Sequence, residues 1–195
     1  MKPYSDACEQ NKYAIFSIIE IEFKNCRNLL EIGSGTGQHA VYFAEQLPAI
    51  TWQTSDKIEN LVGLNAWINE AGLSNLKTPI ELDVTNEWPE STYDGIFSAN
   101  SLHIMNDIEV DYFFKGVNQC LVKSNKLCVY GPFNYGNNYT SKSNENFDLW
   151  LKNRDPLSGI KNFENLNSVA EKNNLEFKED IEMPENNRIL IWLKK

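Results

Sequence analysis

The chain has 195 residues, which is the size of one ordinary domain with a sizeable core. Its 42% hydrophobic and 23% charged residues are typical of a globular protein and exclude extensive disorder or fibrous structure. The formal net charge of −9 disfavours nucleic acid and anionic lipid as partners, because both are themselves negatively charged. We therefore expect one domain spanning residues 1–195.

The first residues lack the apolar core of a signal peptide, and no stretch approaches the length of a membrane-spanning helix. These features predict a cytoplasmic protein with no membrane partner. The four cysteines form no C-x-x-C pair, and only two histidines could join them as ligands. We expect reduced thiols, mostly in the core, and no metal site. No feature of the sequence predicts the oligomeric state.

Apolar residues recur at helical spacing from position 5 to about 24, and Asp6 with Glu9 resembles a capping box. Residues 1–27 are therefore expected to form a helical cover. Short apolar runs then alternate with helical patterns: the predicted strands are 29–32, 50–54, 80–84, 95–99 and 126–130, and the predicted helices are 40–47, 58–71 and 110–121. This alternation predicts an α/β fold with parallel strands and a ligand crevice at their carboxyl ends.

The pattern changes after position 130. A polar stretch over 131–143 precedes two predicted helices near 144–153 and 165–173. Two closing runs, 175–181 and 188–193, flank a short polar turn and predict an antiparallel hairpin at one edge of the sheet. We expect residues 131–174 to form a lid or the substrate side of a site, although such a polar stretch can also be an ordered surface loop.

A glycine loop, Gly33-Ser34-Gly35-Thr36-Gly37, separates the first predicted strand of the sheet from a helix. This context is typical of a nucleotide-binding loop. The dinucleotide fingerprint needs a glycine at position 38, where this chain has Gln38, and this difference disfavours NAD. No Gly-Lys-Ser/Thr follows the loop, so a P-loop is excluded.

Two acidic residues follow at the ends of the next strands. Asp56 lies 19 residues beyond Gly37, close to the roughly 20-residue interval at which a carboxylate reaches ribose hydroxyls. Asp83 ends the third predicted strand and could accept a hydrogen bond from an adenine amino group. Each carboxylate could instead be a solvated loop residue, and the glycines a tight turn. Three such features at successive strand ends favour a nucleoside site.

Residues 31–37, Asp56, Asp83 and the segment 93–103 resemble the motifs of class I S-adenosylmethionine-dependent methyltransferases. The blocks at 33–44, 66–73, 131–134 and 140–144 narrow the resemblance to the methyltransferase-like twenty-six group, also called the domain of unknown function 938 family, and it covers nearly the whole chain. The resemblance implies a Rossmann-like seven-stranded fold with S-adenosylmethionine as cofactor.

The motifs and this resemblance together predict the site. The expected cofactor-binding residues are Glu31, Gly33, Ser34, Gly35, Gly37, Asp56, Asp83, Val84 and Asn100. The expected substrate-side residues are Tyr130, Phe133, Asn134 and Tyr139. His103 is the histidine placed to act as a general base, or else it forms a pocket wall. His39 is expected to pack on its helix. Ser5, Asn11 and Lys12 match the family's N-terminal block, so the first helix closes over the cofactor or only covers the sheet.

These features predict methyl transfer to a small-molecule acceptor, which the sequence does not identify; a protein acceptor stays open. Methyl transfer depends mainly on alignment, so the lack of an obvious catalytic triad does not count against an enzyme. One alternative is a protein that binds the cofactor without turnover. Another is an NAD(P)-dependent oxidoreductase, which Gln38 disfavours.

Overall fold

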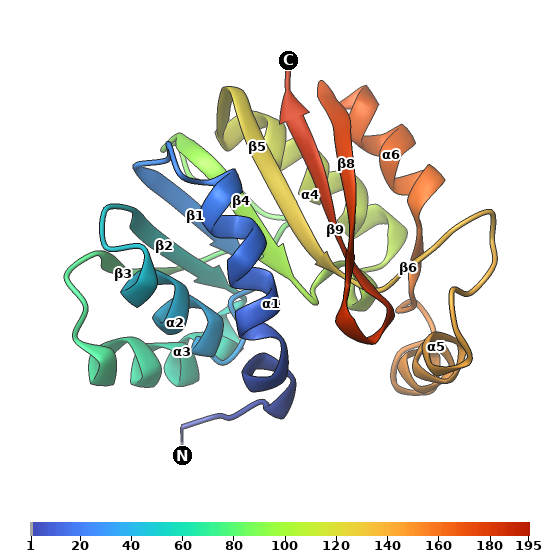
Figure 1. The fold of residues 1–195 in the computed structure, drawn as a ribbon, viewed down its shortest axis with the longest axis horizontal. Helices are drawn as coiled ribbons and strands as arrows, with labels where there is room; N and C mark the ends of the chain where they lie inside the picture. The colour runs from blue at the N-terminus through green and yellow to red at the C-terminus, as the bar shows by residue number, and fades with distance from the viewer. Residues whose placement is uncertain (1) are drawn as a thin grey trace.

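A seven-stranded sheet with the strand order β3-β2-β1-β4-β5-β9-β8 forms the centre of the protein in a computed structural model that describes residues 2–195 (Figure 1). The first five strands pair in parallel, and β9 is antiparallel to both β5 and β8. This arrangement confirms the predicted seven-stranded methyltransferase fold with an antiparallel C-terminal hairpin. The strands are β1 (Asn28–Ile32), β2 (Thr51–Asp56), β3 (Leu76–Glu81), β4 (Tyr93–Ala99), β5 (Leu121–Gly131), β8 (Leu175–Met183) and β9 (Asn187–Lys194).

Helices cover both faces of the sheet. They are α1 (Asp6–Glu22), α2 (Gln38–Gln46), α3 (Ile58–Ala71), α4 (Asp107–Cys120), α5 (Lys142–Arg154) and α6 (Phe163–Lys172). The first helix begins after Ser5, whose hydroxyl accepts a hydrogen bond from the backbone N–H of Cys8. The N-cap is therefore Ser5, one residue before the Asp6 that the capping-box pattern indicated. The serine oxygen can take this place because it reaches a free N–H group of the first turn.

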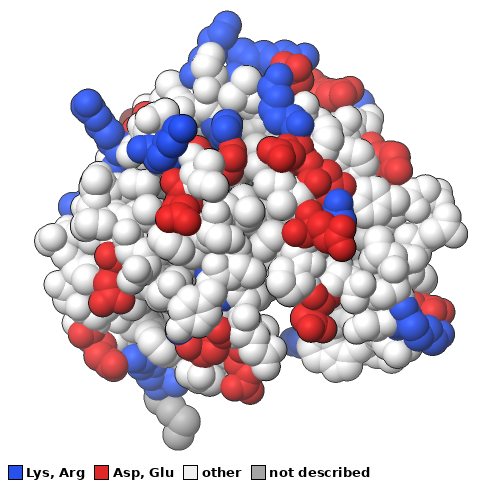
Figure 2. Space-filling model, in the orientation of Figure 1, with Lys and Arg blue, Asp and Glu red and all other residues white. Residues whose placement is uncertain are grey.

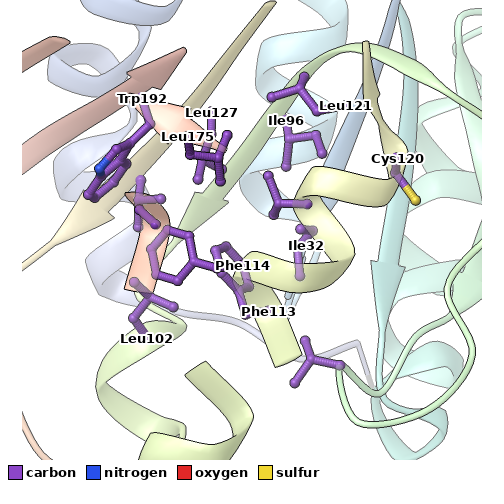
Figure 3. Close-up of a cluster of buried hydrophobic side chains, with 14 of the residues drawn as sticks. Ile32, Ile96, Leu102, Phe113, Phe114, Cys120, Leu121, Leu127, Leu175 and Trp192 are labelled. Atoms are coloured by element: carbon purple, nitrogen blue, oxygen red, sulfur yellow. The ribbon is translucent and has the colours of Figure 1, made fainter. Parts of the chain in front are cut away.

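Two hydrophobic clusters fill the spaces between the sheet and its helices. One cluster joins α1, α2 and α3 to the sheet, for example through Ile19 and Phe43 against Trp52. The other joins α4 and α6 to the opposite face, with Phe114 of α4 at its centre (Figure 3). Because both faces are buried, the central strands carry continuous apolar runs instead of an alternating pattern, and these runs made them visible in the sequence.

The third strand differs from the prediction. It spans Leu76–Glu81, whereas the apolar run predicted 80–84. This is an edge strand and is largely exposed, so its own residues give a weak apolar signal, and it tolerates Pro79 in its middle. Leu82 and Val84 are buried because the chain turns inward after the strand. Asp83 therefore lies in the loop that follows β3.

The parts of region 131–174 lie at different places relative to the main sheet. A short two-stranded sheet pairs β6 (Phe133–Asn134) with β7 (Lys161–Asn162). Helix α6 packs on β8 and α4, and so covers the sheet. Helix α5 stands apart from the main sheet near the carboxyl ends of the parallel strands (Figure 1). Within this region, α5 and its flanking loops are therefore the part to which the expectation of a lid or substrate side applies. That the chain forms one domain stays a prediction.

The surface agrees with the acidic composition. On the face in Figure 2, lysine and arginine side chains gather mainly at the end where β9 finishes, and acidic and uncharged residues dominate elsewhere. Within residues 2–195, no helix is both long and apolar enough to cross a membrane. All four cysteines have free thiols, with Cys120 and Cys128 buried and the other two half-buried.

Candidate functional site

A cavity of about 830 Å³ lies at the carboxyl ends of the parallel strands. Its walls come from the loops after β1, β2, β3 and β4, from the first turns of α1, and from one side of α5. Cavities of this size hold small ligands, and the carboxyl edge of a parallel sheet is where such folds bind them. The cavity is therefore the candidate site.

The glycine loop forms one wall through Gly33, Ser34, Gly35 and Thr36. Gly33 has φ +72°, and a Cβ there would lie 2.4 Å from Ser101 Oγ. Gly35 has φ +56°, and a Cβ there would meet nothing within 4 Å. The first glycine thus permits close packing within the protein, and the second leaves backbone open to the cavity.

Asp56 stands beside this loop at the end of β2. One carboxylate oxygen, Oδ2, accepts a hydrogen bond from the N–H of Gly35 over 2.6 Å. The other, Oδ1, accepts from the backbone N–H of Lys57 (2.8 Å) and from Asn60 Nδ2 (2.7 Å). Asp56 is 7% exposed and lines the cavity, so its carboxylate is fixed in place, and with three of its roughly four acceptor positions used it can accept one further hydrogen bond from a ligand.

Glu31 lies beneath the loop and does not line the cavity. Its carboxylate accepts a hydrogen bond from Trp52 Nε1 over 2.9 Å, and the residue is 1% exposed. Burial raises the pKa of Glu31 to about 7, because removal from water disfavours the charged form. Glu31 therefore supports the loop from inside the protein, and a direct contact with a ligand in the cavity is not available to it in this arrangement.

Asp83 also lies outside the set of residues that line the cavity, although its neighbours Leu82 and Val84 belong to that set. Its Oδ1 accepts hydrogen bonds from the backbone N–H (3.0 Å) and the hydroxyl (2.7 Å) of Thr85. Those bonds lower the pKa of Asp83. Its Oδ2 is 3.4 Å from Lys57 Nζ, which also pairs with Glu109 at 3.2 Å.

The two histidines both border the cavity and are buried. His103 packs edge-on against Phe147, and burial lowers its pKa to about 4. His39 stacks on Phe43, its Nε2 is 2.7 Å from Asn11 Oδ1, and burial lowers its pKa to about 4. Both imidazoles are therefore neutral at pH 7. His39 packs on Phe43 of its own helix, as expected, and it also borders the cavity.

Hydrogen bonds fasten the start of α1 to the start of α2. Gln38 Oε1 accepts from the backbone N–H of Ser5 (2.6 Å), and Gln38 Nε2 donates to Glu9 Oε1 (2.8 Å). Ser5, Ala7, Cys8 and Asn11 then complete the cavity wall. The N-terminal helix thus covers the sheet and also closes one side of the site.

The structure brings together eight of the predicted site residues along the cavity: Gly33, Ser34, Gly35, Asp56, Val84, Asn100, His103 and Tyr130. Six others lie outside its lining: Glu31, Gly37, Asp83, Phe133, Asn134 and Tyr139. A Cβ at Gly37 would meet Leu64 of α3 at 2.7 Å, so this glycine serves packing. The hydroxyl of Tyr139 donates to Asp148 of α5 over 2.6 Å.

The predicted substrate-side region 131–174 includes α5, but none of the residues by which this helix lines the cavity was among the predicted site residues. Phe147, Trp150, Leu151 and Arg154 all line the cavity from this helix. Their spacing is helical, and this pattern is also what a helix packed on a core shows, so the sequence alone gave no reason to assign them to a site. Lys57, Asn60 and Glu109 were missed because isolated polar residues at the starts of helices are common.

The protein is similar in fold to several solved methyltransferase structures. The mitomycin 7-O-methyltransferase MmcR matches 97% of this chain with a TM-score of 0.85 and 14% identity, over 54% of its own chain. An O-methyltransferase family protein from Burkholderia thailandensis matches 97% with a TM-score of 0.85 and 13% identity, over 58% of its own. PigF with SAH matches 94% with a TM-score of 0.80 and 14% identity, over 56% of its own.

The chain therefore has the α/β fold of class I methyltransferases, and it spans a little more than half the length of these structures. A family model described as "Protein of unknown function (DUF938)" matches residues 2–194. The chain belongs to this family. The predicted resemblance to the domain of unknown function 938 family is thus confirmed.

Proposed function

We propose that the protein is an S-adenosylmethionine-dependent methyltransferase that acts on a small-molecule acceptor. One observation carries this proposal: a glycine loop and the fixed carboxylate of Asp56 border the same cavity at the carboxyl edge of the sheet. The similar fold of methyltransferase structures, one of them described with SAH, supports it. The finer assignment to the methyltransferase-like twenty-six group stays a prediction.

The residues along the cavity fit the parts of this cofactor. The open backbone at Gly35 admits a close ligand, and the carboxylate of Asp56 has one acceptor position left for a ribose hydroxyl. To accept from the second hydroxyl as well, it must release the amide of Asn60 or one of its backbone donors. Leu82 and Val84 offer apolar surface for adenine. Asn100, held at φ +56° with its N–H bonded to the carbonyl of Tyr130 (2.9 Å), is assigned to the methionine portion.

The role predicted for Asp83 needs a rearrangement. Its Oδ1 already serves Thr85, and Oδ2 faces Lys57. To accept a hydrogen bond from the adenine amino group, the carboxylate must exchange Lys57 for that group. Glu109 remains to hold the Lys57 ammonium, so the exchange leaves no unpaired cation.

When bound, S-adenosylmethionine supplies an activated methyl group: the lone pair of the acceptor forms the new bond to carbon, the carbon–sulfur electron pair stays on sulfur, and the acceptor proton leaves to water. The chain's own task is to align and dehydrate the reactants, which can contribute about 7–11 kcal/mol. We assign His103 to positioning the acceptor, because a pKa of about 4 makes it a weak base.

The test has two stages. Calorimetry with S-adenosylhomocysteine, with NAD⁺ as the comparison ligand, measures which cofactor the cavity takes. Metabolite extract is then incubated with the protein and methyl-labelled S-adenosylmethionine, and labelled products are sought by mass spectrometry. Binding of S-adenosylhomocysteine but not NAD⁺, with a labelled product, is the expected result. Binding of NAD⁺ alone would contradict the proposal, and cofactor binding without labelling of any extract would favour a binding protein without turnover.

A further inference from the structure

The cavity has a second end that the proposed cofactor residues do not use. Helix α5 forms its wall there with Phe147, Trp150 and Arg154, and His103 lies against Phe147. The rings of Phe147 and Trp150 are stacked, with centroids 5.8 Å apart and an angle of 17° between their planes. This end of the cavity therefore has a broad aromatic wall.

The aromatic wall is exposed to a degree that is unusual for such residues. Trp150 is 50% exposed, and Ile104, which lines the cavity nearby, is 55% exposed. Exposed apolar surface beside a cavity is a feature of binding sites, because a ligand that covers it gains the free energy of removing it from water.

A single cation ends this wall. The Cζ atom of Arg154 lies 4.7 Å from the centroid of the Trp150 ring, and Arg154 forms no ion pair within residues 2–195. By contrast, Lys57, the other cation along the cavity, is paired with Asp83 and Glu109. The guanidinium of Arg154 thus keeps its donors available for a carboxylate from outside the protein, which it can bind with two parallel hydrogen bonds.

The wall is fixed relative to His103 by hydrogen bonds behind it. Asp148 of α5 accepts from the backbone N–H of Ile160 over 2.7 Å, and the N–H of the preceding residue, Gly159, donates to the carbonyl of His103 over 2.8 Å. Asp148 is 1% exposed and also holds Lys152 and Tyr139. The helix that carries the aromatic wall and the imidazole of His103 are therefore held in one arrangement, which lowers the ordering cost of binding.

We infer that this end of the cavity binds a planar aromatic acceptor that carries a carboxylate, with the ring against Phe147 and Trp150 and the carboxylate on Arg154. From Phe147 to Arg154 the helix rises about 10 Å, a length that a fused two-ring skeleton with a carboxylate can span. The inference names the substrate class of the proposed methyltransferase and rests on that function.

Binding to the full chain saturated with S-adenosylhomocysteine tests this assignment. The probe is 6-hydroxy-2-naphthoate, compared with 6-hydroxy-2-naphthamide, which lacks the charge, and with the saturated decalin acid, which lacks the planar ring. We expect the naphthoate to bind about tenfold more tightly than either comparison compound, because a charge-assisted bidentate pair and aromatic contacts both contribute.

Variants on one helix separate the two contributions. Arg154→Gln should abolish the preference for acid over amide, and Trp150→Ala should weaken both aromatic probes at least about fivefold. Lys142 and Leu149 are exposed positions of α5 outside the cavity lining. Lys142→Gln and Leu149→Ala should therefore change neither the preference for acid over amide nor the affinity for the aromatic probes. Circular dichroism checks that each variant is folded.

The outcomes distinguish the two proposals. If the unmodified chain does not bind S-adenosylhomocysteine, the proposed function itself is wrong. If that ligand binds but the naphthoate does not bind, or binds no better than the amide, the acceptor class is wrong while the cofactor site stands. An unchanged affinity in both Trp150→Ala and Arg154→Gln would also overturn the assignment to α5.

Discussion

The N–H of Gly35 and the Oδ2 atom of Asp56 form a 2.6 Å hydrogen bond that ties the glycine loop after β1 to the end of β2. The carboxylate proposed to hold the ribose thus also fixes the backbone of the neighbouring loop. Substitution of Asp56 removes both effects together, so its consequences should exceed the loss of one ligand contact.

The first prediction concerns this carboxylate. Asp56→Ala should lower the affinity for S-adenosylhomocysteine at least about tenfold, because hydrogen bonds to a charged group are typically worth about 1.5–3 kcal/mol. Asp56→Asn keeps one acceptor oxygen and should lose less. Glu81→Gln, at the exposed end of the adjacent strand β3, is the matched control. Calorimetry measures all three, and an alanine variant that binds like the unmodified protein would remove Asp56 from the site.

The second prediction separates backbone strain from ligand contact. Gly35 and Gly72 have nearly the same φ, +56° and +61°, and a Cβ at either would meet no atom within 4 Å. Each glycine-to-alanine change should therefore lower the free energy of unfolding by about 1–2 kcal/mol, the cost of the left-handed conformation. Only Gly35→Ala should also weaken S-adenosylhomocysteine, by about tenfold, because its methyl group enters the cavity.

Urea unfolding and calorimetry on the same two variants supply the measurements. Equal losses of cofactor affinity in Gly35→Ala and Gly72→Ala would show that strain alone weakens binding. Unchanged affinity in both would show that the ligand does not approach the backbone at Gly35.

The third prediction concerns His103, which separates a base-assisted reaction from one that depends on alignment. His103→Gln should leave the affinity for S-adenosylhomocysteine unchanged and lower turnover of the acceptor by less than about 10²-fold, the lower end of what loss of a general base costs. With a pKa of about 4, the imidazole stays neutral above pH 5.5 and should add no acid-side limb to the rate profile there.

A larger loss of turnover, together with an acid-side limb near pH 6.5 that disappears in the variant, would establish His103 as the base. A loss of cofactor affinity in the same variant would contradict both roles and place His103 in the cofactor pocket. The affinity measurement is independent of the acceptor, so it comes first.

The fourth prediction uses the buried carboxyl of Glu31. Its pKa of about 7 lies above the value of about 4.3 for an unfolded chain, so the folded state binds the extra proton and loses stability as pH rises from about 4.3 to 7. Glu31→Gln removes this titration and can still accept a hydrogen bond from Trp52 Nε1. The variant should therefore gain stability relative to the unmodified protein as pH rises, by about 2–4 kcal/mol between pH 4.5 and 8.

Urea unfolding at several pH values measures this difference. His39 and His103 have lowered pKa values and act in the opposite direction, with stability lost as pH falls from about 6.5 to 4. Both proteins contain these histidines, so their effect cancels in the difference. A pH-independent difference would show that Glu31 ionises in the folded state as readily as in water.

Local sequence patterns account for most of the architecture. Apolar runs such as 29–32 and 95–99 predicted their strands because both faces of the sheet are covered, and the glycine loop was visible from its spacing. The edge strand β3 was misplaced because Leu82 and Val84, which carry the apolar signal, are buried after the strand ends. A buried loop and a buried strand look alike in a short apolar run.

The sequence by itself determined the order of strands and helices, the glycine loop and the position of Asp56, because spacing along the chain sets these features. Only the tertiary structure decided which side chains share the cavity. Phe147, Trp150 and Arg154 reach it because Asp148 fastens α5 to Ile160, 12 residues further along the chain. Tyr139 and Asn134 lie outside the cavity lining, although both follow β5, whose residue Tyr130 is part of that lining. Such contacts depend on packing between distant segments, and periodicity within one segment carries no record of them.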